Sequence, residues 1–185
     1  MNRIRIAVVA AQVIALCIGA AGCAGSNPKV QIEMEDGGKI TVALDRENAP
    51  LTVENFLSLV NSSFYDGLTF HRIVPGFVIQ GGDPNGDGTG GSDKQIKGEF
   101  RENGVNNNIS HVRGVISMAR SLDNNSASSQ FFITLSDDAV FLDGKYAAFG
   151  KVTSGMDVVD KIAAVPTSDE RPLQPVIIKS IKVIN

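Results

Sequence analysis

The strongest constraint on the fold is a pair of alternating segments that flank a short glycine turn. Apolar and polar side chains alternate over residues 29–34 and again over residues 39–44, with Asp36-Gly37-Gly38 between them. A period of two places the apolar side chains on one face of a strand, and an Asp-Gly-Gly segment favours a tight turn. We therefore predict that the folded part of the chain opens with an antiparallel β-hairpin.

Two other segments show the period of a helix. Apolar residues recur at spacings of three and four after Pro50 and again after Gly155, which is typical of an amphipathic helix. We expect Thr52 to cap the first helix through its hydroxyl group. The two apolar stripes consist of Val53, Phe56, Leu57 and Val60, and of Met156, Val159, Ile162 and Ala163.

Short segments rich in β-branched and aromatic residues make up most of the remaining chain. They cover residues 70–74, 77–80, 115–119, 130–135, 147–152 and 176–184. Many short strands with two helices predict a mainly β fold, a barrel closed at its ends by the helices. The long segment 81–113 is mostly Gly, Asn, Asp and Ser, and we expect it to form a wall of the functional site.

The first 22 residues follow the order of an export signal. Arg3 and Arg5 precede an apolar run over residues 6–19, and small residues then lead to Cys23. This run is short for a membrane-spanning helix. We predict that residues 1–22 are removed on export and that residues 29–185 form a single folded domain.

The residues around Cys23 indicate how the exported chain is held. Ala20-Ala21-Gly22-Cys23 resembles the lipobox of bacterial lipoproteins, although Ala20 stands where leucine is usual. The resemblance implies acylation of Cys23, with residues 23–28 as a short tether to a membrane of the cell envelope, outside the cytoplasm. An ordinary signal-peptidase cut nearby, giving a secreted soluble protein, is the alternative. Since Cys17 lies in the removed segment, no disulfide can form within the mature chain.

Composition excludes several classes of function. Removing Arg3 and Arg5 leaves 15 basic residues against 20 acidic ones, a net charge of −5. A mildly acidic chain without a basic cluster is a poor binder of nucleic acid. His71 and His111 stand outside any metal-ligand spacing, and we expect neither a metal nor a cofactor.

Two patterns in the long loop are typical of other functions but lack the necessary context. Residues 86–91 satisfy GxGxxG, yet no βαβ unit surrounds them. Residues 83–88 copy the opening of an EF-hand loop, but Lys94 occupies the twelfth position, where glutamate is required. Dinucleotide binding is therefore not indicated, and a weak incidental cation site is the most that the second pattern supports.

One dense segment resembles the signature of the cyclophilins. It runs from Phe70 to Asp83 and reads FHRIVPGFVIQGGD. The similarity continues in register through residues 50–56, 114–120, 126–133 and 141–152, so that it covers about residues 29–184. The resemblance implies a closed, antiparallel, eight-stranded β-barrel capped by two α-helices, and a peptidyl-prolyl cis–trans isomerase in residues 29–185.

Isomerase chemistry suits an arginine better than a nucleophile. Rotation of an X-Pro bond must overcome about 20 kcal/mol of partial double-bond character, and no bond is made or broken. A fixed donor that favours the twisted amide lowers this barrier. By the resemblance, Arg72 is that catalytic donor, and Gln80 grips the substrate backbone and helps to position it.

The resemblance also implies a set of substrate-binding residues. An apolar pocket for the proline ring is expected from Phe77, Val78, Phe132, Leu142 and Tyr146, with the main chain at Ala119 and Arg120 beside the peptide, Gln130 in support and Phe141 nearby. Val78, Phe141 and Tyr146 replace the methionine, tryptophan and histidine common in eukaryotic members. Because Phe141 lacks the indole N–H, the resemblance implies weak cyclosporin binding.

We therefore expect a monomeric rotamase that acts on unfolded or flexible proline-containing segments of exported proteins. The alternative is a membrane-tethered chaperone module that binds proline peptides without significant catalysis. The presence of Arg72, Phe77, Gln80 and Phe132 together favours the enzyme.

Overall fold

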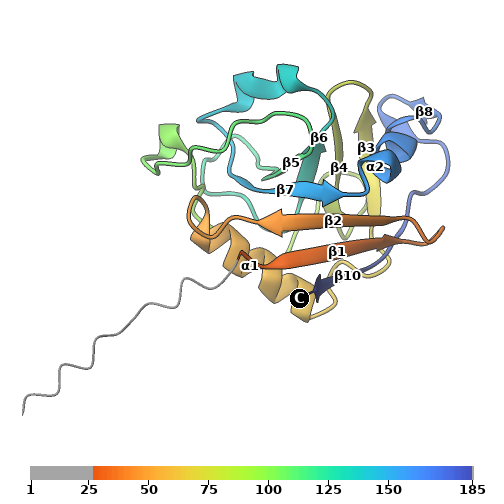
Figure 1. Ribbon diagram of the computed structural model, residues 1–185, viewed down its shortest axis with the longest axis horizontal. Coiled ribbons are helices and arrows are strands. Elements are labelled where there is room, and N and C mark those ends of the chain that lie inside the picture. Colours follow the sequence, from red (N-terminus) through yellow and green to blue (C-terminus); the bar gives the residue numbers. More distant parts are fainter. Residues whose placement is uncertain (1–26, 185) are drawn as a thin grey trace, which may run out of the picture.

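The computed structural model describes residues 27–184, in which eight strands form one antiparallel sheet (Figure 1). The order across the sheet is β10-β1-β2-β7-β5-β6-β4-β3. The strands are β1 (Lys29–Met34), β2 (Lys39–Leu44), β3 (Thr69–Val74), β4 (Val78–Asp83), β5 (Val115–Met118), β6 (Phe131–Thr134), β7 (Ala148–Ser154) and β10 (Ile178–Ile184). Every strand expected from the alternating and β-rich segments is present, with boundaries shifted by no more than three residues.

The sheet curls until its two edge strands approach each other. An isolated bridge joins Thr69 to Ile177, and the Phe70 N–H donates to the Val176 carbonyl at 2.9 Å. The mainly β, eight-stranded antiparallel fold with two helices is thus confirmed. Since no continuous ladder joins β3 to β10 in residues 27–184, the expected closed barrel is better described as a curled sheet, or half-barrel.

Two helices lie at opposite sides of the curled sheet (Figure 1). They are α1 (Pro50–Asn61) and α2 (Met156–Ala163), as the apolar stripes predict. The short elements η1 (Arg101–Asn103), η2 (Asp137–Leu142), β8 (Thr167–Ser168) and β9 (Arg171–Pro172) were not expected. Within the described residues, no helix has the length and apolar character needed to cross a membrane.

The main hydrophobic core fills the inside of the curled sheet. Phe56 of α1 lies at its centre, and its ring is 5.7 Å from that of Phe131 and 5.1 Å from those of Tyr65 and Phe149. All four side chains are fully buried. Burial of such aromatic side chains is a leading favourable contribution to the stability of a fold.

The N-terminus of α1 is capped from the long loop and not by Thr52. The N-cap residue is Ala49, which offers no side-chain acceptor. The buried Glu99 carboxylate instead accepts the N–H of Leu51 at 3.0 Å and that of Thr52 at 2.7 Å, and the Thr52 hydroxyl donates to it at 2.6 Å. The expected Thr52 cap is therefore wrong, and the glutamate both satisfies the helix start and anchors the loop.

Replacing Glu99 with alanine should destabilise the fold. Glu99→Ala leaves the buried Thr52 N–H group without an acceptor, and we expect the free energy of unfolding to fall by about 2 kcal/mol. Urea denaturation monitored by circular dichroism measures this change. Glu54→Ala, which removes an exposed carboxylate from the same helix, serves as control, and equal stability of the two variants would contradict the capping role.

Both histidines are buried. Burial lowers the pKa of His71 and of His111 below the ordinary value of 6.5, although the carboxylates of Asp83 and Asp143 act in the opposite direction. His111 also packs under Phe132, with ring centroids 6.1 Å apart, and its Nε2 lies 3.0 Å from the Ser117 hydroxyl. The fold therefore favours the neutral imidazoles.

Stability should consequently decrease as the solution becomes acidic. The unfolded chain binds protons at the two histidines more readily than the folded chain, so stability is complete above about pH 6.5 and falls as the pH drops toward the lowered pKa values. Unfolding free energies measured by urea between pH 7.5 and 5.0 should show this decrease. The slope should be smaller in His71→Gln, and a profile without any slope would refute the assignment.

Candidate active site

Arg72 faces away from the main core because strand β3 contains a β-bulge. In the pairing of β3 with β4, Phe70 lies opposite Gly81 and Arg72 lies opposite Gln80, so that His71 is an extra residue. Phe70 and Ile73 are both buried in the main core. They are three residues apart, whereas in a regular strand residues on the same face are two apart. Bulges change the direction in which side chains point, and this one turns Arg72 to the outer face of the sheet.

A second irregularity on β4 accommodates the first. Thr69 pairs with Asp83 and Phe70 with Gly81, which leaves Gly82 as the extra residue on that strand. Its φ of +83° is one that glycine adopts readily. A Cβ atom there would lie 2.6 Å from the Ser129 carbonyl oxygen, so a side chain does not fit.

A small apolar cluster covers the outer face of the sheet beside Arg72. Its buried members are Val78, Phe132, Ala139 and Leu142, and its partly buried members are Val74, Phe77, Ala119 and Tyr146. A pocket of about 220 Å³ opens into this cluster. Apolar floors with a few polar groups at the rim are typical of ligand sites, and the size suits a ring such as that of proline.

Three polar side chains, those of Arg72, Gln80 and Gln130, form a continuous row along the rim of the pocket. The Arg72 Nη1 group donates to Gln80 Oε1 at 3.3 Å, and Gln80 Nε2 donates to Gln130 Oε1 at 2.9 Å. Gln130 Nε2 in turn donates to the carbonyl oxygens of Gly88 and Gly90 at 3.0 and 2.7 Å. The row fixes the orientation of both amides and ties them to the long loop.

Arg72 has a second partner that no sequence pattern indicated. Its Nε atom lies 2.7 Å from Oε2 of Glu170, which stands between β8 and β9. The Arg72 side chain is 36% exposed. Its guanidinium is thus held by Gln80 and Glu170 while remaining accessible from solution.

Arg120 also lines the pocket, next to Tyr146. Its guanidinium lies 4.8 Å from the ring centroid of Tyr146 and 5.2 Å from that of Phe100. Its Nε group also donates to the Lys145 carbonyl at 3.0 Å. These contacts hold Tyr146 in the pocket wall through a cation–π interaction and a hydrogen bond.

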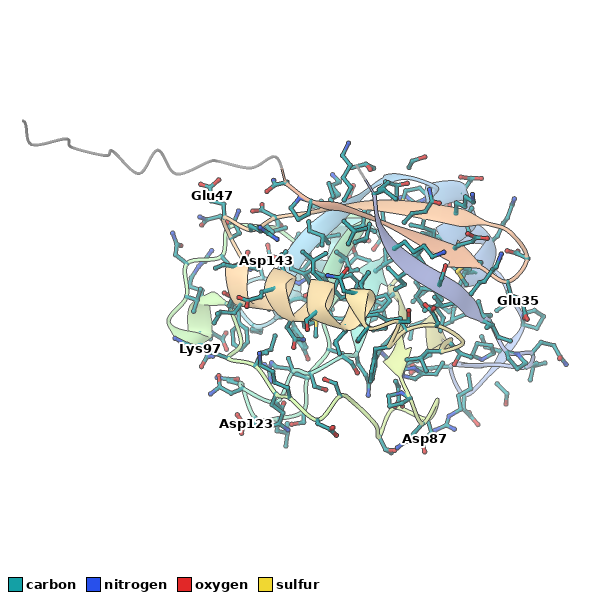
Figure 2. The ribbon with its side chains drawn as sticks, turned by 90° about the horizontal axis from the view of Figure 1, so that it is seen from below. Glu35, Glu47, Asp87, Lys97, Asp123 and Asp143 are labelled. Atoms are coloured by element: carbon teal, nitrogen blue, oxygen red, sulfur yellow. The ribbon has the colours of Figure 1, made fainter. Side chains whose placement is uncertain are left out.

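A second hollow of about 360 Å³ adjoins the pocket and shares Gln80, Ala119 and Arg120 with it. Its far walls are residues 88–92 of the long loop and polar residues between 121 and 128. Figure 2 shows Asp87 and Asp123, which belong to these two loops, along the same edge of the molecule. The expectation that the long loop walls the site agrees with this arrangement.

Most of the residues expected at the site come together in space. The pocket is lined by Arg72, Phe77, Val78, Gln80, Ala119, Arg120, Phe132, Leu142 and Tyr146. Gln130 lies one hydrogen bond away and lines the adjoining hollow. Phe141 is 60% exposed and stacks on Phe77 at 5.6 Å, which places it at the rim. Cys23 lies outside the described residues.

The EF-hand-like pattern of the long loop is occupied with hydrogen bonds inside its own turn. The Asp83 carboxylate, the first position of the EF-hand-like pattern, accepts the N–H groups of Asn85, Asp87 and Gly88. It thereby stabilises its own turn. Among residues 27–184, no group of three or more His, Cys, Asp or Glu side chains is arranged to hold a metal ion.

Comparison with known proteins gives a consistent family. Residues 29–183 match the family described as cyclophilin type peptidyl-prolyl cis-trans isomerase/CLD. The chain is 42% identical over 156 residues to peptidyl-prolyl cis-trans isomerase A of Dickeya dadantii, with 80% of each sequence covered. It is 42% identical over 162 residues to a peptidyl-prolyl cis-trans isomerase of Acinetobacter baylyi, with 82% and 84% covered.

A solved structure agrees with these matches. The cyclophilin type isomerase of Cryptosporidium parvum, crystallised in the presence of the dipeptide Ala-Pro, superposes with a TM-score of 0.77 at 32% sequence identity. The superposition covers 85% of this chain and 99% of that one. Sequence and fold thus point to one family, and the chain belongs to it: it is a cyclophilin-type peptidyl-prolyl cis–trans isomerase.

Proposed function

We propose that this isomerase accelerates X-Pro rotation in exported proteins, with Arg72 as the hydrogen-bond donor beside an apolar proline pocket. The observation that supports this role is the position of the Arg72 guanidinium at the rim of the pocket, held by Gln80 and still 36% exposed. An arginine remains charged at any physiological pH and presents several N–H groups in one plane.

The proposed mechanism depends on differential binding. The proline ring enters the apolar cluster, while Gln80 holds the backbone of the same peptide. During rotation the amide loses conjugation, and electron density returns to the imide nitrogen. A fixed cationic donor next to this nitrogen stabilises the twisted form more than either planar form, which lowers the barrier without a covalent step. The other residues that line the pocket form the substrate-binding surface in this proposal.

Removal of the guanidinium should abolish most of the catalysis. For Arg72→Ala we expect kcat/KM to fall about 100-fold, the order found when one preorganised donor is removed from a site. A stopped-flow assay that follows the cis population of an Ala-Pro-Phe peptide measures this change. Arg72→Lys should recover only part of the rate because it keeps the charge and loses the planar fork.

A matched control separates the role of Arg72 from a loss of positive charge. Arg46 is an exposed arginine outside the site, and Arg46→Ala should retain the wild-type rate. Wild-type kcat/KM in Arg72→Ala would remove Arg72 from the mechanism while leaving the family assignment intact.

We also propose that the enzyme works outside the cytoplasm as a lipid-anchored monomer. The basic, apolar and small residues of segment 1–22 and the lipobox-like Ala20-Ala21-Gly22-Cys23 support this location. The alternative of a secreted soluble form follows if cleavage occurs elsewhere. Its substrates would be flexible proline-containing segments of other exported chains, and weak cyclosporin binding stays a prediction from Phe141.

Loss of the acylated cysteine should release the protein from membranes. When the full 185-residue chain is expressed in a bacterial host, Cys23→Ala should move it from the membrane fraction to the soluble fraction and abolish labelling by a radioactive fatty acid. Cys17→Ala is the matched control, since this cysteine lies in the segment that is removed. Membrane partitioning that is unchanged in Cys23→Ala would argue for another mode of attachment.

A further inference from the structure

We infer that Glu170 is a positioning residue for Arg72, so that the short β8–β9 hairpin is part of the catalytic apparatus. The inference rests on the proposed role of Arg72 and adds to it a residue that lies 98 positions away in the sequence. Glu170 Oε2 is 2.7 Å from Arg72 Nε, whereas Gln80 Oε1 is 3.3 Å from Arg72 Nη1. Two anchored nitrogens fix the plane of a guanidinium, and its remaining N–H groups stay available to a peptide in the pocket.

The hairpin is attached directly to the strand that carries Arg72. The Ile73 N–H donates to the main-chain carbonyl of Glu170 at 2.7 Å. Glu170 therefore contacts two consecutive residues of β3, one through its backbone and one through its side chain. The carboxylate is thus held in register with Arg72 by a bond that does not involve the ion pair itself.

A second attachment joins the hairpin to the long loop. The Arg171 Nη2 group donates to the carbonyl oxygen of Asp87 at 3.1 Å. The same loop accepts hydrogen bonds from Gln130 at Gly88 and Gly90. The hairpin and the two glutamine side chains are consequently both attached to the long loop. Arg72 is bonded to each of them, through Glu170 and through Gln80.

The backbone of the hairpin turn is unusual. Asp169 and Glu170 have φ angles of 50° and 65°, in the left-handed region that residues other than glycine seldom adopt. Such conformations persist where the surrounding structure holds them and are enriched at functional sites. Here the turn directs the Glu170 side chain back toward β3.

The Arg72–Glu170 ion pair is better suited to orienting the guanidinium than to stabilising the fold. The side chains of Arg72 and Glu170 are 36% and 50% exposed, and ion pairs at this exposure contribute little to the free energy of folding. Orientation of a catalytic group, in contrast, affects the rate strongly even when displacements are small. We therefore expect Glu170 to influence kcat more than thermal stability.

The test is the isosteric substitution Glu170→Gln in the full chain. The neutral amide is a weaker acceptor for the Arg72 Nε–H group, and we expect kcat to fall about threefold with KM unchanged. Glu54→Gln makes the same isosteric change at an exposed carboxylate on α1, outside the site. No ion pair among residues 27–184 involves Glu54, so this variant should retain the wild-type kcat.

A spectroscopic measurement and a double variant complete the test. The Nε–Hε resonance of Arg72 should be protected from solvent exchange in the wild type and in Glu54→Gln, and should lose this protection in Glu170→Gln. In the Arg72→Ala background, Glu170→Gln should cause no further loss of rate, because a positioning residue acts only through its partner.

The outcomes distinguish this inference from the proposed function on which it rests. Full activity of Arg72→Ala would defeat the proposed role of Arg72. A large loss in Arg72→Ala with wild-type kcat and unchanged Hε protection in Glu170→Gln would defeat the positioning role alone. An equal loss of rate from Glu170→Gln with and without Arg72 would also overturn it, because Glu170 would then act by another route.

Discussion

The paired irregularity of β3 and β4 is the constraint on which the site depends. With regular alternation, Arg72 would follow Phe70 into the main core, where an ion has no adequate partner and its desolvation is costly. The additional residue at His71 gives the inward position to Ile73 and turns Arg72 outward. Gly82 takes up the mismatch on the neighbouring strand at a point where the Ser129 carbonyl leaves no space for a Cβ atom. The guanidinium, the amide row and the apolar cluster meet on one face for this reason.

Local periodicity, together with segments rich in β-branched and aromatic residues, was sufficient to predict the eight strands of the main sheet and the two α-helices. A strand with one buried face must alternate, and a helix with one buried stripe must repeat at three and four residues, so 29–44 and 50–61 are visible in the sequence. The β8–β9 hairpin consists of two-residue strands, which are too short to show a period. The cap of α1 by Glu99 joins residues 47 and 48 positions apart, and no local pattern encodes such a contact.

The residues of the pocket were predicted from the in-register similarity to the cyclophilins. The geometry of the pocket was not predicted. Tyr146 and Leu142 read alone as ordinary core residues, and only their order relative to the Phe70 to Asp83 segment marked them for the site. The sequence could not indicate the facing of Arg72, because a bulge is a property of the pairing between two strands. Glu170 was missed for the related reason that its partner lies on a distant strand.

The presence of two separate apolar clusters has a consequence for how this enzyme can diverge. The main core lies inside the curled sheet and the pocket cluster lies outside it, with one layer of backbone between them. Substitutions such as those at Val78, Phe141 and Tyr146 change the lining of the pocket without opening a cavity around Phe56. Substitutions that alter substrate preference can therefore accumulate with little effect on the stability of the fold. The sheet acts as a partition between the part of the sequence that must be kept and the part that is free to vary.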